Sequence, residues 1–342
     1  MFFRLCKKIA FLGIILVITG CVSTGPYIDR DEFNRLEEDL RIKALRTKIE
    51  RTIYVNNIGY KLLRSLNLQG KKYPFLGALV ADLNKYTAKI FGKIPEEGRV
   101  IVYGLIKGSP AEKSDLKIGD IILTINSREV SPSNFYSLVR GLSLNKPCRI
   151  FVERDADYRE IIIYPQALPY YINFLVVESP DINASAFRGG VAVTYGLLNF
   201  IRSDDELAIV LGHELAHLIK GHILKSEGTG ILFSALALAF SKNVDMPQSE
   251  DLGRLLGRIF QAKFSRDFER EADFIGTLIA YQGGFDISKG IDIWERIAIE
   301  IPASLSSDFL ASHPASGERL LRIKKIVEKI RNKEINPQDY LR

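Results

Sequence analysis

The stretch that decides the fold is SDDELAIVLGHELAHLIKG, residues 203–221. Its first residues form a capping box, in which Ser203 caps the helix and Glu206 follows three positions later. Two aspartates between them complement the positive end of the helix dipole. Gly221 is a residue type that commonly ends a helix. The stretch therefore predicts a helix over residues 203–220.

Inside this predicted helix lies HELAH, residues 213–217. Residues four apart share one helical face, so His213 and His217 can converge on a single metal ion while Glu214 lies beside them. Zinc hydrolysis requires two neutral nitrogen ligands and a nearby carboxylate. The chain has four histidines in all, and three of them fall within ten positions. This clustering favours a metal site over the alternative, two hydrogen-bonded histidines on a core helix.

A hydrolytic zinc site needs a third protein ligand and one open position. The segment SRDFEREADFIG, residues 265–276, predicts a second helix that offers three acidic residues. Glu269 and Asp273 are four apart and share a face, whereas Glu271 projects elsewhere. Placed against the two histidines, Glu269 becomes the third ligand, and Asp273 accepts the outer N–H of a ligating histidine. Without HELAH, the same segment would be interpreted as a solvated run of charges.

HELAH followed by ExxAD resembles the gluzincin zinc metallopeptidases of the HtpX, BepA and CAAX prenyl protease type 1 family (peptidase family M48). The resemblance covers most of residues 168–330, including the Asn-Ala pair at residues 183–184. It implies one Zn²⁺ per chain, with three zinc ligands, a catalytic base and a residue that supports a ligand. The implied zinc ligands are His213, His217 and Glu269. Glu214 is the implied catalytic base, and Asp273 is the implied supporting residue.

The segment HPASGER, residues 313–319, resembles the family's HPxxxxR segment, which implies that a histidine and an arginine lie near the metal. His313 either stabilises the oxyanion or occupies the open zinc position at rest. Arg319 either binds a substrate carbonyl or pairs with a carboxylate. His222, one turn beyond the ligand pair, is assigned a supporting role and not a zinc ligand.

Two β-like runs precede HELAH, YINFLVV at residues 171–177 and GGVAVTYGLL at residues 189–198. A protease substrate must be extended to expose its backbone, and an extended chain can pair with the edge of a sheet. We expect residues 190–195 to provide that edge, through Gly190, Val191, Ala192 and Val193. The expected substrate is unfolded or exposed polypeptide. Residues 166–342 are thus predicted to form the metallopeptidase domain.

Residues 74–165 have a different texture, with short β-rich runs separated by Gly and Pro. The stretch GSPAEKSDLKIGD, residues 108–120, resembles the segment that joins two strands of a PDZ domain through a short helix. Phe75, Leu76 and Gly77 look like the loop that binds a peptide carboxylate, and residues 133–142 look like the helix beside the groove. Such a groove binds a peptide as an added strand. The alternative is a PDZ-shaped spacer that binds nothing.

The amino terminus carries a basic stretch, an apolar run at residues 9–18 and then Thr-Gly-Cys, which is the plan of a secretory signal over residues 1–20. The ending resembles the lipobox of bacterial lipoproteins, which implies lipidation of Cys21. Val22 is not the aspartate typical of inner-membrane retention, so we expect a lipid anchor on the periplasmic face of the outer membrane. A short tether and a helical region, residues 29–66, occupy residues 21–73.

Charge and cysteine content exclude other classes. The net charge is +6, and removal of residues 1–20, with three basic residues and no acid, leaves 44 basic against 41 acidic residues, or +3. This small excess argues against nucleic acid as a partner. Cys148 is left alone, so no intrachain disulfide is expected. The apolar run at residues 230–240 is too short to span a membrane and is predicted to be a buried helix.

The fold expected is α+β, a mainly helical zincin-type metallopeptidase domain with a small sheet, plus a β-rich PDZ domain. The function expected is a membrane-tethered zinc metalloendopeptidase acting on unfolded or misassembled envelope proteins, among them outer-membrane proteins, with the PDZ domain selecting substrates. The alternative is an envelope chaperone or assembly scaffold with a largely dormant metal site.

Overall fold

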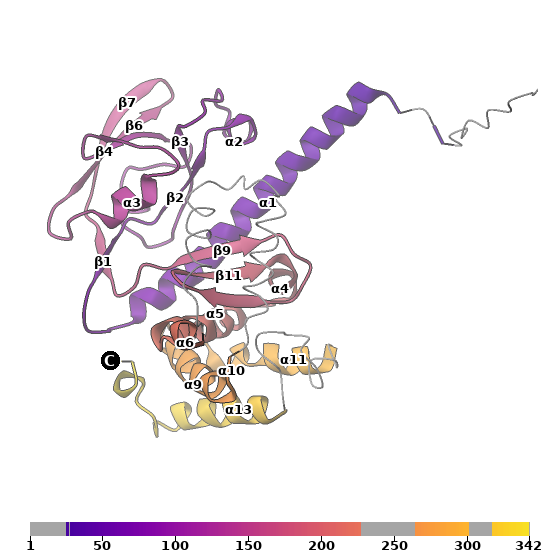
Figure 1. Ribbon diagram of the computed structural model, residues 1–342, viewed down its shortest axis with the longest axis vertical. Helices are drawn as coiled ribbons and strands as arrows, with labels where there is room; N and C mark the ends of the chain where they lie inside the picture. Colours follow the sequence, from indigo (N-terminus) through magenta and orange to yellow (C-terminus); the bar gives the residue numbers. More distant parts are fainter. Residues whose placement is uncertain (1–24, 27, 227–263, 301–316, 342) are drawn as a thin grey trace, which may run out of the picture. The chain divides into compact units, whose positions relative to one another are not determined.

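The computed structural model describes residues 25–26, 28–226, 264–300 and 317–341 (Figure 1). The predicted signal, the predicted lipidation site Cys21, the apolar run at residues 230–240 and His313 lie outside the described residues. The described residues divide into two units, with the boundary between Leu40 and Arg41. The first turns of helix α1 belong to the former unit, and everything that follows belongs to the latter.

The helical lead is one long helix, α1, Arg30–Ser65. Its residues from Ile42 onward bury apolar side chains in two separate cores. Leu45 and Ile49 pack with the outer face of the PDZ-like sheet, whereas Val55 and Leu62 pack with the helices and sheet that follow residue 170. The helix is therefore a shared structural element of both parts of the larger unit.

The PDZ-like segment is built on a six-stranded antiparallel sheet with the order β2-β3-β4-β6-β7, in which a short β5 pairs with β4. Two short helices, α2 and α3, complete it (Figure 1). The bounds are β2 Ala78–Asp82, α2 Lys85–Phe91, β3 Val100–Leu105, β4 Ile121–Ile125, β5 Arg128–Glu129, α3 Phe135–Arg140, β6 Cys148–Arg154 and β7 Asp157–Ile163.

Strand β6 explains how the sheet forms its inner core. Its buried and exposed residues alternate, with Cys148, Ile150 and Val152 facing inward. The period of two is that of a strand with one buried face. The two ends of the segment are tied together, because β1, Tyr73–Phe75, pairs antiparallel with β8, Gln166–Leu168. The PDZ-like segment thus starts and ends at one place, close to the predicted boundaries at residues 74 and 165.

The connection at residues 108–120 differs from the expectation. It contains turns, not a short helix. The serines in it bond the backbone, since Ser109 Oγ accepts from Glu112 N and Ser114 Oγ donates to Ala111 O. Such local bonds compete with the backbone bonds of a helix.

The segment from residue 173 begins with a three-stranded sheet, β9 Asn173–Val177, β10 Ala184–Phe187 and β11 Gly190–Thr194. The strand order is β10-β11-β9, with β10 antiparallel and β9 parallel to β11. The predicted run at residues 189–198 is a strand only as far as Thr194. Thr194 then caps helix α4, Tyr195–Phe200, by accepting from Leu197 N.

Helices follow this sheet and pack on it. Their bounds are α5 Asp204–Ile219, α6 His222–Ser226, α9 Arg266–Gln282, α10 Ile287–Gly290, α11 Asp292–Glu300, α13 Gly317–Arg331 and the 3-10 helix η1 Pro337–Asp339. The mixture of helices and separate sheets confirms the predicted α+β class. Among the residues that the structure describes, no helix has both the length and the apolar character needed to cross a membrane.

Candidate metal centre

Helix α5 presents the HELAH residues, and its start forms as predicted. Ser203 Oγ accepts a hydrogen bond of 3.2 Å from Glu206 N. The Glu206 carboxylate reaches back to the N–H of Arg202, one residue before the expected cap, and also pairs with Arg296. Because this carboxylate is buried, the arginine compensates for its charge.

Two glycines bring α5 against α9. A Cβ on Gly212 would lie 2.5 Å from the carbonyl oxygen of Gly276, and a Cβ on Gly276 would lie 2.6 Å from the Cα of His213. Any larger residue at either position would push the helices apart. The crossing point directly precedes His213 on α5 and follows Asp273 on α9. This close approach therefore places the acidic residues of α9 beside the histidines of α5.

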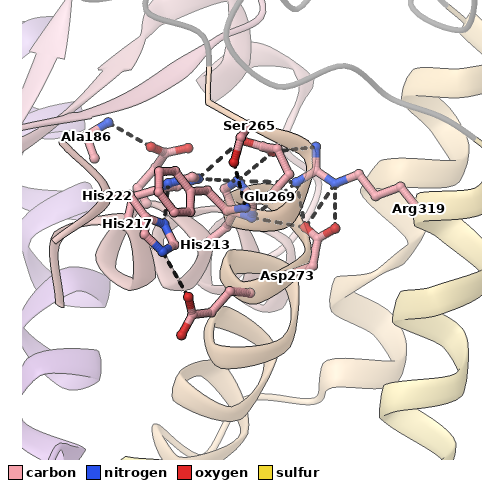
Figure 2. Close-up of polar contacts among 11 residues, drawn as sticks. Ala186, His213, His217, His222, Ser265, Glu269, Asp273 and Arg319 are labelled. Carbon is pink, nitrogen blue, oxygen red and sulfur yellow. Dashed lines mark hydrogen bonds and ion pairs between the residues drawn. The ribbon is translucent and has the colours of Figure 1, made fainter. Parts of the chain in front are cut away.

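Three donors meet at this crossing, as Figure 2 shows. The Nε2 atoms of His213 and His217 are 3.1 Å apart. Glu269 places one carboxylate oxygen 3.5 Å from His213 Nε2 and the other 3.4 Å from His217 Nε2. Tetrahedral zinc with bonds of about 2.0–2.1 Å separates its ligand atoms by about 3.3 Å. The buried donor set of two imidazoles and a carboxylate therefore fits a zinc ion.

Glu214 follows His213 on α5 and is almost fully buried. Its Oε2 accepts a hydrogen bond of 2.7 Å from the main-chain N–H of Ala186 on β10 (Figure 2). The carboxylate is therefore held between helix α5 and the edge of the three-stranded sheet.

Asp273 and Arg319 support His213, and the Arg319 guanidinium also lies 3.9 Å from the Glu269 carboxylate. Asp273 Oδ1 lies 3.0 Å from His213 Nδ1, the contact that the sequence predicted. Arg319 Nε contacts both Asp273 oxygens at 2.9 and 3.0 Å, and its guanidinium stacks 4.0 Å from the Trp294 ring. Of the two roles considered for Arg319, the structure contains the pairing with a carboxylate. His222, also buried, places its Nδ1 3.0 Å from His217 Nδ1.

These contacts shift the pKa values of Asp273 and His213. Burial alone would raise the pKa of Asp273, but the Arg319 charge and the hydrogen bond from His213 hold that pKa below its usual range. Burial and the Arg319 charge lower the pKa of His213, yet hydrogen bonds to Asp273 and Glu269 outweigh them and raise it to about 9. Both shifts arise because two carboxylates and one arginine surround the same imidazole.

The expected substrate edge at residues 190–195 is wrong. Strand β11 has a hydrogen-bonded partner on each side, β10 and β9, so Gly190, Val191, Ala192 and Val193 form the middle of the sheet. The edge next to α5 is β10. Since Ala186 N points to Glu214, the main chain of Ala186 faces away from β11.

Sequence reasoning also missed Ala186, Trp294 and the paired glycines. A glycine directly before HELAH and another three residues after the ExxAD aspartate were visible as the signal for a close helix crossing. The contact of Ala186 had no such signal, because it depends on how β10 pairs. In the predicted loop, Phe75 is the last residue of β1, and Leu76 and Gly77 link β1 to β2; the loop is described below with the PDZ groove.

Comparisons with known proteins agree with this geometry. Residues 158–327 match the family described as "Peptidase family M48", and residues 74–163 match "PDZ domain". The chain is similar to the mitochondrial metalloendopeptidase OMA1 of Arabidopsis thaliana, with 33% identity over 147 residues, 42% of this chain and 29% of the relative. It is similar to OMA1 of Bos taurus, with 31% identity over 204 residues, 52% of this chain and 39% of the relative.

A bacterial relative is the metalloprotease LoiP of Escherichia coli strain K12, with 30% identity over 157 residues, 45% of this chain and 62% of the relative. The chain thus spans less than half the length of the two OMA1 proteins and less than two thirds of LoiP. The family match covers the sheet, α5, α6, α9, α11 and most of α13, which together carry every described residue of the metal centre. Residues 158–327 therefore form a peptidase domain of family M48, and a PDZ domain at residues 74–163 lies ahead of it in the sequence.

Proposed function

We propose that the protein is a zinc metalloendopeptidase. The observation that carries the proposal is the donor set of His213, His217 and Glu269, whose ligand atoms lie within 4.8 Å of one another beside the buried carboxylate of Glu214. These three residues would hold one zinc ion. When bound, zinc supplies a Lewis acid that polarises the scissile carbonyl.

Glu214 is the proposed general base. Its carboxylate takes a proton from the attacking water and passes it to the leaving amine. Ala186 N–H holds one carboxylate oxygen in place. Asp273 orients His213 through its Nδ1 atom, and Arg319 compensates for the buried charge of Asp273. His313 lies outside the described residues. Its role, as an oxyanion partner or a resting zinc ligand, stays a prediction.

The proposed substrate edge is now β10, not β11. Residues 184 and 186 share one side of the strand, because main-chain groups alternate along it. An extended polypeptide that pairs with this edge would run beside Glu214. Pairing through the main chain places few demands on side chains. This supports unfolded or exposed polypeptide as the substrate class.

We also propose that the PDZ groove selects substrates. Leu76 and Gly77 have their carbonyl oxygens bonded to Ala111 N and Ile106 N at 2.8 and 2.9 Å. Their peptide planes are thereby fixed, and a peptide carboxylate would bind the N–H side of the loop. This loop, the start of edge strand β2 and helix α3 line one cavity of about 1010 Å³. The apolar side chains of Phe135 and Val139 offer it a hydrophobic wall.

The cellular setting completes the proposal. A lipid anchor at Cys21 would tether the protein to the periplasmic face of the outer membrane, where unfolded or misassembled envelope proteins, including those of the outer membrane, are the substrates. The lipobox-like ending at Cys21 supports this setting. Labelling with a radioactive fatty acid, in the wild type and in Cys21→Ser, tests it, and equal labelling of both would contradict it.

The decisive test of the peptidase activity uses the full chain in detergent, with zinc measured per chain. Wild type should bind one zinc and cleave an unfolded polypeptide. Glu214→Gln should bind as much zinc and lose at least about 10²-fold in cleavage rate, because general base catalysis contributes that much. Glu160, which is exposed, supplies the matched control, Glu160→Gln. Cleavage that survives unchanged in Glu214→Gln would contradict the peptidase proposal, and a zinc-loaded wild type that cleaves nothing would favour the alternative, a chaperone or scaffold with a dormant site.

The PDZ proposal is tested by comparing one client with a free carboxyl terminus and the same client with an amidated terminus. If the loop binds a terminal carboxylate, the free form should have a lower KM with unchanged kcat. Equal KM values would rule out selection of the terminus.

A further inference from the structure

Helix α9 is connected to both ring nitrogens of the zinc-ligand candidate His217, directly at Nε2 and through His222 at Nδ1. On the metal side, Glu269 Oε1 lies 3.4 Å from His217 Nε2. On the opposite side, His217 Nδ1 lies 3.0 Å from His222 Nδ1, and His222 Nε2 lies 3.1 Å from Glu271 Oε2. The carboxylate of Glu271 is thus connected to the metal centre by two imidazole rings.

Zinc binding by His217 would fix which ring nitrogens of His217 and His222 carry a proton. A neutral imidazole that offers its Nε2 lone pair to zinc carries its proton on Nδ1. The two Nδ1 atoms of His217 and His222 can share one proton only, so His222 Nδ1 must be the acceptor. The proton of a neutral His222 then sits on Nε2, from which it is donated to Glu271. Each position is fixed by the one before it, and a carboxylate ends the series.

We propose that Glu271 is a positioning residue for the zinc ligand His217 and acts through His222. The inference rests on the proposed zinc site and extends it by a residue whose side chain never approaches the metal donors. Ligating histidines generally donate their outer N–H to a carboxylate, a carbonyl or water. His213 has Asp273 directly in this place. For His217 the carboxylate is one imidazole further away.

Burial and neighbouring aromatic rings hold the imidazoles of His217 and His222 in place. His217 and His222 are completely buried. The ring of Phe264 stacks 3.9 Å from that of His217, and the ring of Phe268 stacks 4.3 Å from that of His222 at 8°. Since aromatic stacking restricts rotation of both imidazoles, the hydrogen bonds decide which nitrogen carries the proton.

The turn after α5 brings His222 to this place. Gly221 has φ of +67°, a left-handed conformation that glycine adopts without strain. It ends α5 and lets the chain begin α6 at His222, below His217. Lys220 contacts the other oxygen of Glu271 at 3.6 Å. The acceptor is therefore held from two sides, by His222 and by Lys220.

Without Glu271, the Nε2–H of His222 loses its acceptor. His222 can then move its proton to Nδ1, where it opposes the Nδ1–H of His217. His217 would have to carry its proton on Nε2 instead, and that tautomer cannot bind zinc. Loss of an outer partner of this type typically costs about 10- to 100-fold in metal affinity.

The test compares Glu271→Ala, Glu271→Gln and Asp267→Ala in the full chain in detergent. Asp267 is an exposed carboxylate on the same helix, paired with Arg270, and serves as the matched control. Zinc affinity is measured by competition with a chromophoric chelator. We expect Glu271→Ala to weaken zinc binding about 10- to 100-fold. Glu271→Gln should lose less, because its amide oxygen still accepts, and Asp267→Ala should match the wild type.

A spectroscopic readout separates positioning from a general structural role. The chain has only four histidines, so ¹⁵N-histidine labelling gives an interpretable spectrum of the zinc-loaded protein. His222 should carry its proton on Nε2 in the wild type and in Glu271→Gln, and lose that preference in Glu271→Ala. If Glu271→Ala fails to fold, judged by circular dichroism, the wild-type tautomers and Glu271→Gln carry the test.

The outcomes distinguish the two proposals. A wild type that binds no zinc would refute the zinc site itself. A wild type that binds zinc while Glu271→Ala binds it within twofold would overturn the role of Glu271 alone. A wild-type proton on His222 Nδ1, or an equal loss of affinity in Glu271→Gln and Glu271→Ala, would also overturn it, because hydrogen bonding would then not be the cause.

Discussion

The main-chain N–H of Ala186 donates a hydrogen bond of 2.7 Å to the buried carboxylate of Glu214. This contact joins the edge of the three-stranded sheet to the helix that carries the two histidines. It makes the orientation of the proposed general base depend on the strand that would also bind substrate. A substitution that removes one N–H group, without changing any side chain of the centre, should therefore affect catalysis.

Ala186→Pro removes this donor. Proline is tolerated on an edge strand where its nitrogen faces away from the ladder. A hydrogen bond to a charged group is worth about 1.5–3 kcal/mol, so kcat should fall about 10- to 100-fold. Zinc content should be unchanged. Ala186→Gly keeps the N–H and is the control, and equal kcat values for the two variants would contradict the role of this contact.

The buried pair of Asp273 and Arg319 should behave as one unit. Both side chains are at least 95% buried, and Arg319 Nη2 lies 2.7 Å from Asp273 Oδ1. Removing one partner leaves an uncompensated buried charge, which costs about 3–5 kcal/mol. We expect Asp273→Asn and Arg319→Met each to lower the free energy of unfolding by about this amount. The double variant should lose clearly less than the sum, because neither charge remains.

Urea unfolding in the presence of a chelator measures this pair without any contribution from bound metal. Losses that simply add in the double variant would show that the two residues do not depend on each other.

Gly59 should tolerate no side chain. A Cβ at this position of α1 would lie 2.4 Å from the ring of Phe174 on β9, and that ring is itself buried. In an open helix interior, Gly→Ala gains about 1 kcal/mol. Here overpacking should dominate, and Gly59→Ala should lower the free energy of unfolding by about 1–3 kcal/mol. In a Phe174→Leu background the same substitution should cost less. A stabilising Gly59→Ala would refute the tight contact.

The metal donors could be predicted from the sequence because their geometry is local. A spacing of four residues fixes the relation of His213 to His217, and of Glu269 to Asp273, within any helix. Strand order is not local. Residues 190–194 are apolar and β-like, but only their pairing with both β9 and β10 makes them the middle of the sheet. The edge was therefore assigned to the wrong strand.

The contacts of Glu271 show a second limit of prediction from the sequence. Its separation from Glu269 by two positions correctly placed it off the face that meets the metal. The sequence could not show what it does contact, because His222 is reached only through the left-handed turn at Gly221. The connection at residues 108–120 shows the same limit. The resemblance to PDZ domains predicted a short helix there, but hydrogen bonds between serine side chains and the backbone favour turns.

Cys148 should report on the opening of the PDZ domain. It lies in the core on β6 with 1% of its surface exposed, and burial raises the pKa of its thiol from 9.0 to about 11. The thiolate is the form that reacts with alkylating reagents. In a Cys6→Ser, Cys21→Ser variant at pH 8, iodoacetamide should therefore modify Cys148 more slowly than an exposed thiol, at a rate set by local opening.

The direction of the pH effect on stability follows from the same shift. Between pH 9 and about 11 the folded chain keeps a thiol proton that the unfolded chain releases. The stabilisation is complete below pH 9 and declines as the pH rises toward 11. The control for the labelling experiment is an exposed thiol two residues before β6, Lys146→Cys in a background with all three native cysteines replaced by serine. Equal labelling rates at Cys148 and at this introduced cysteine, with urea absent, would show that the core around β6 opens freely.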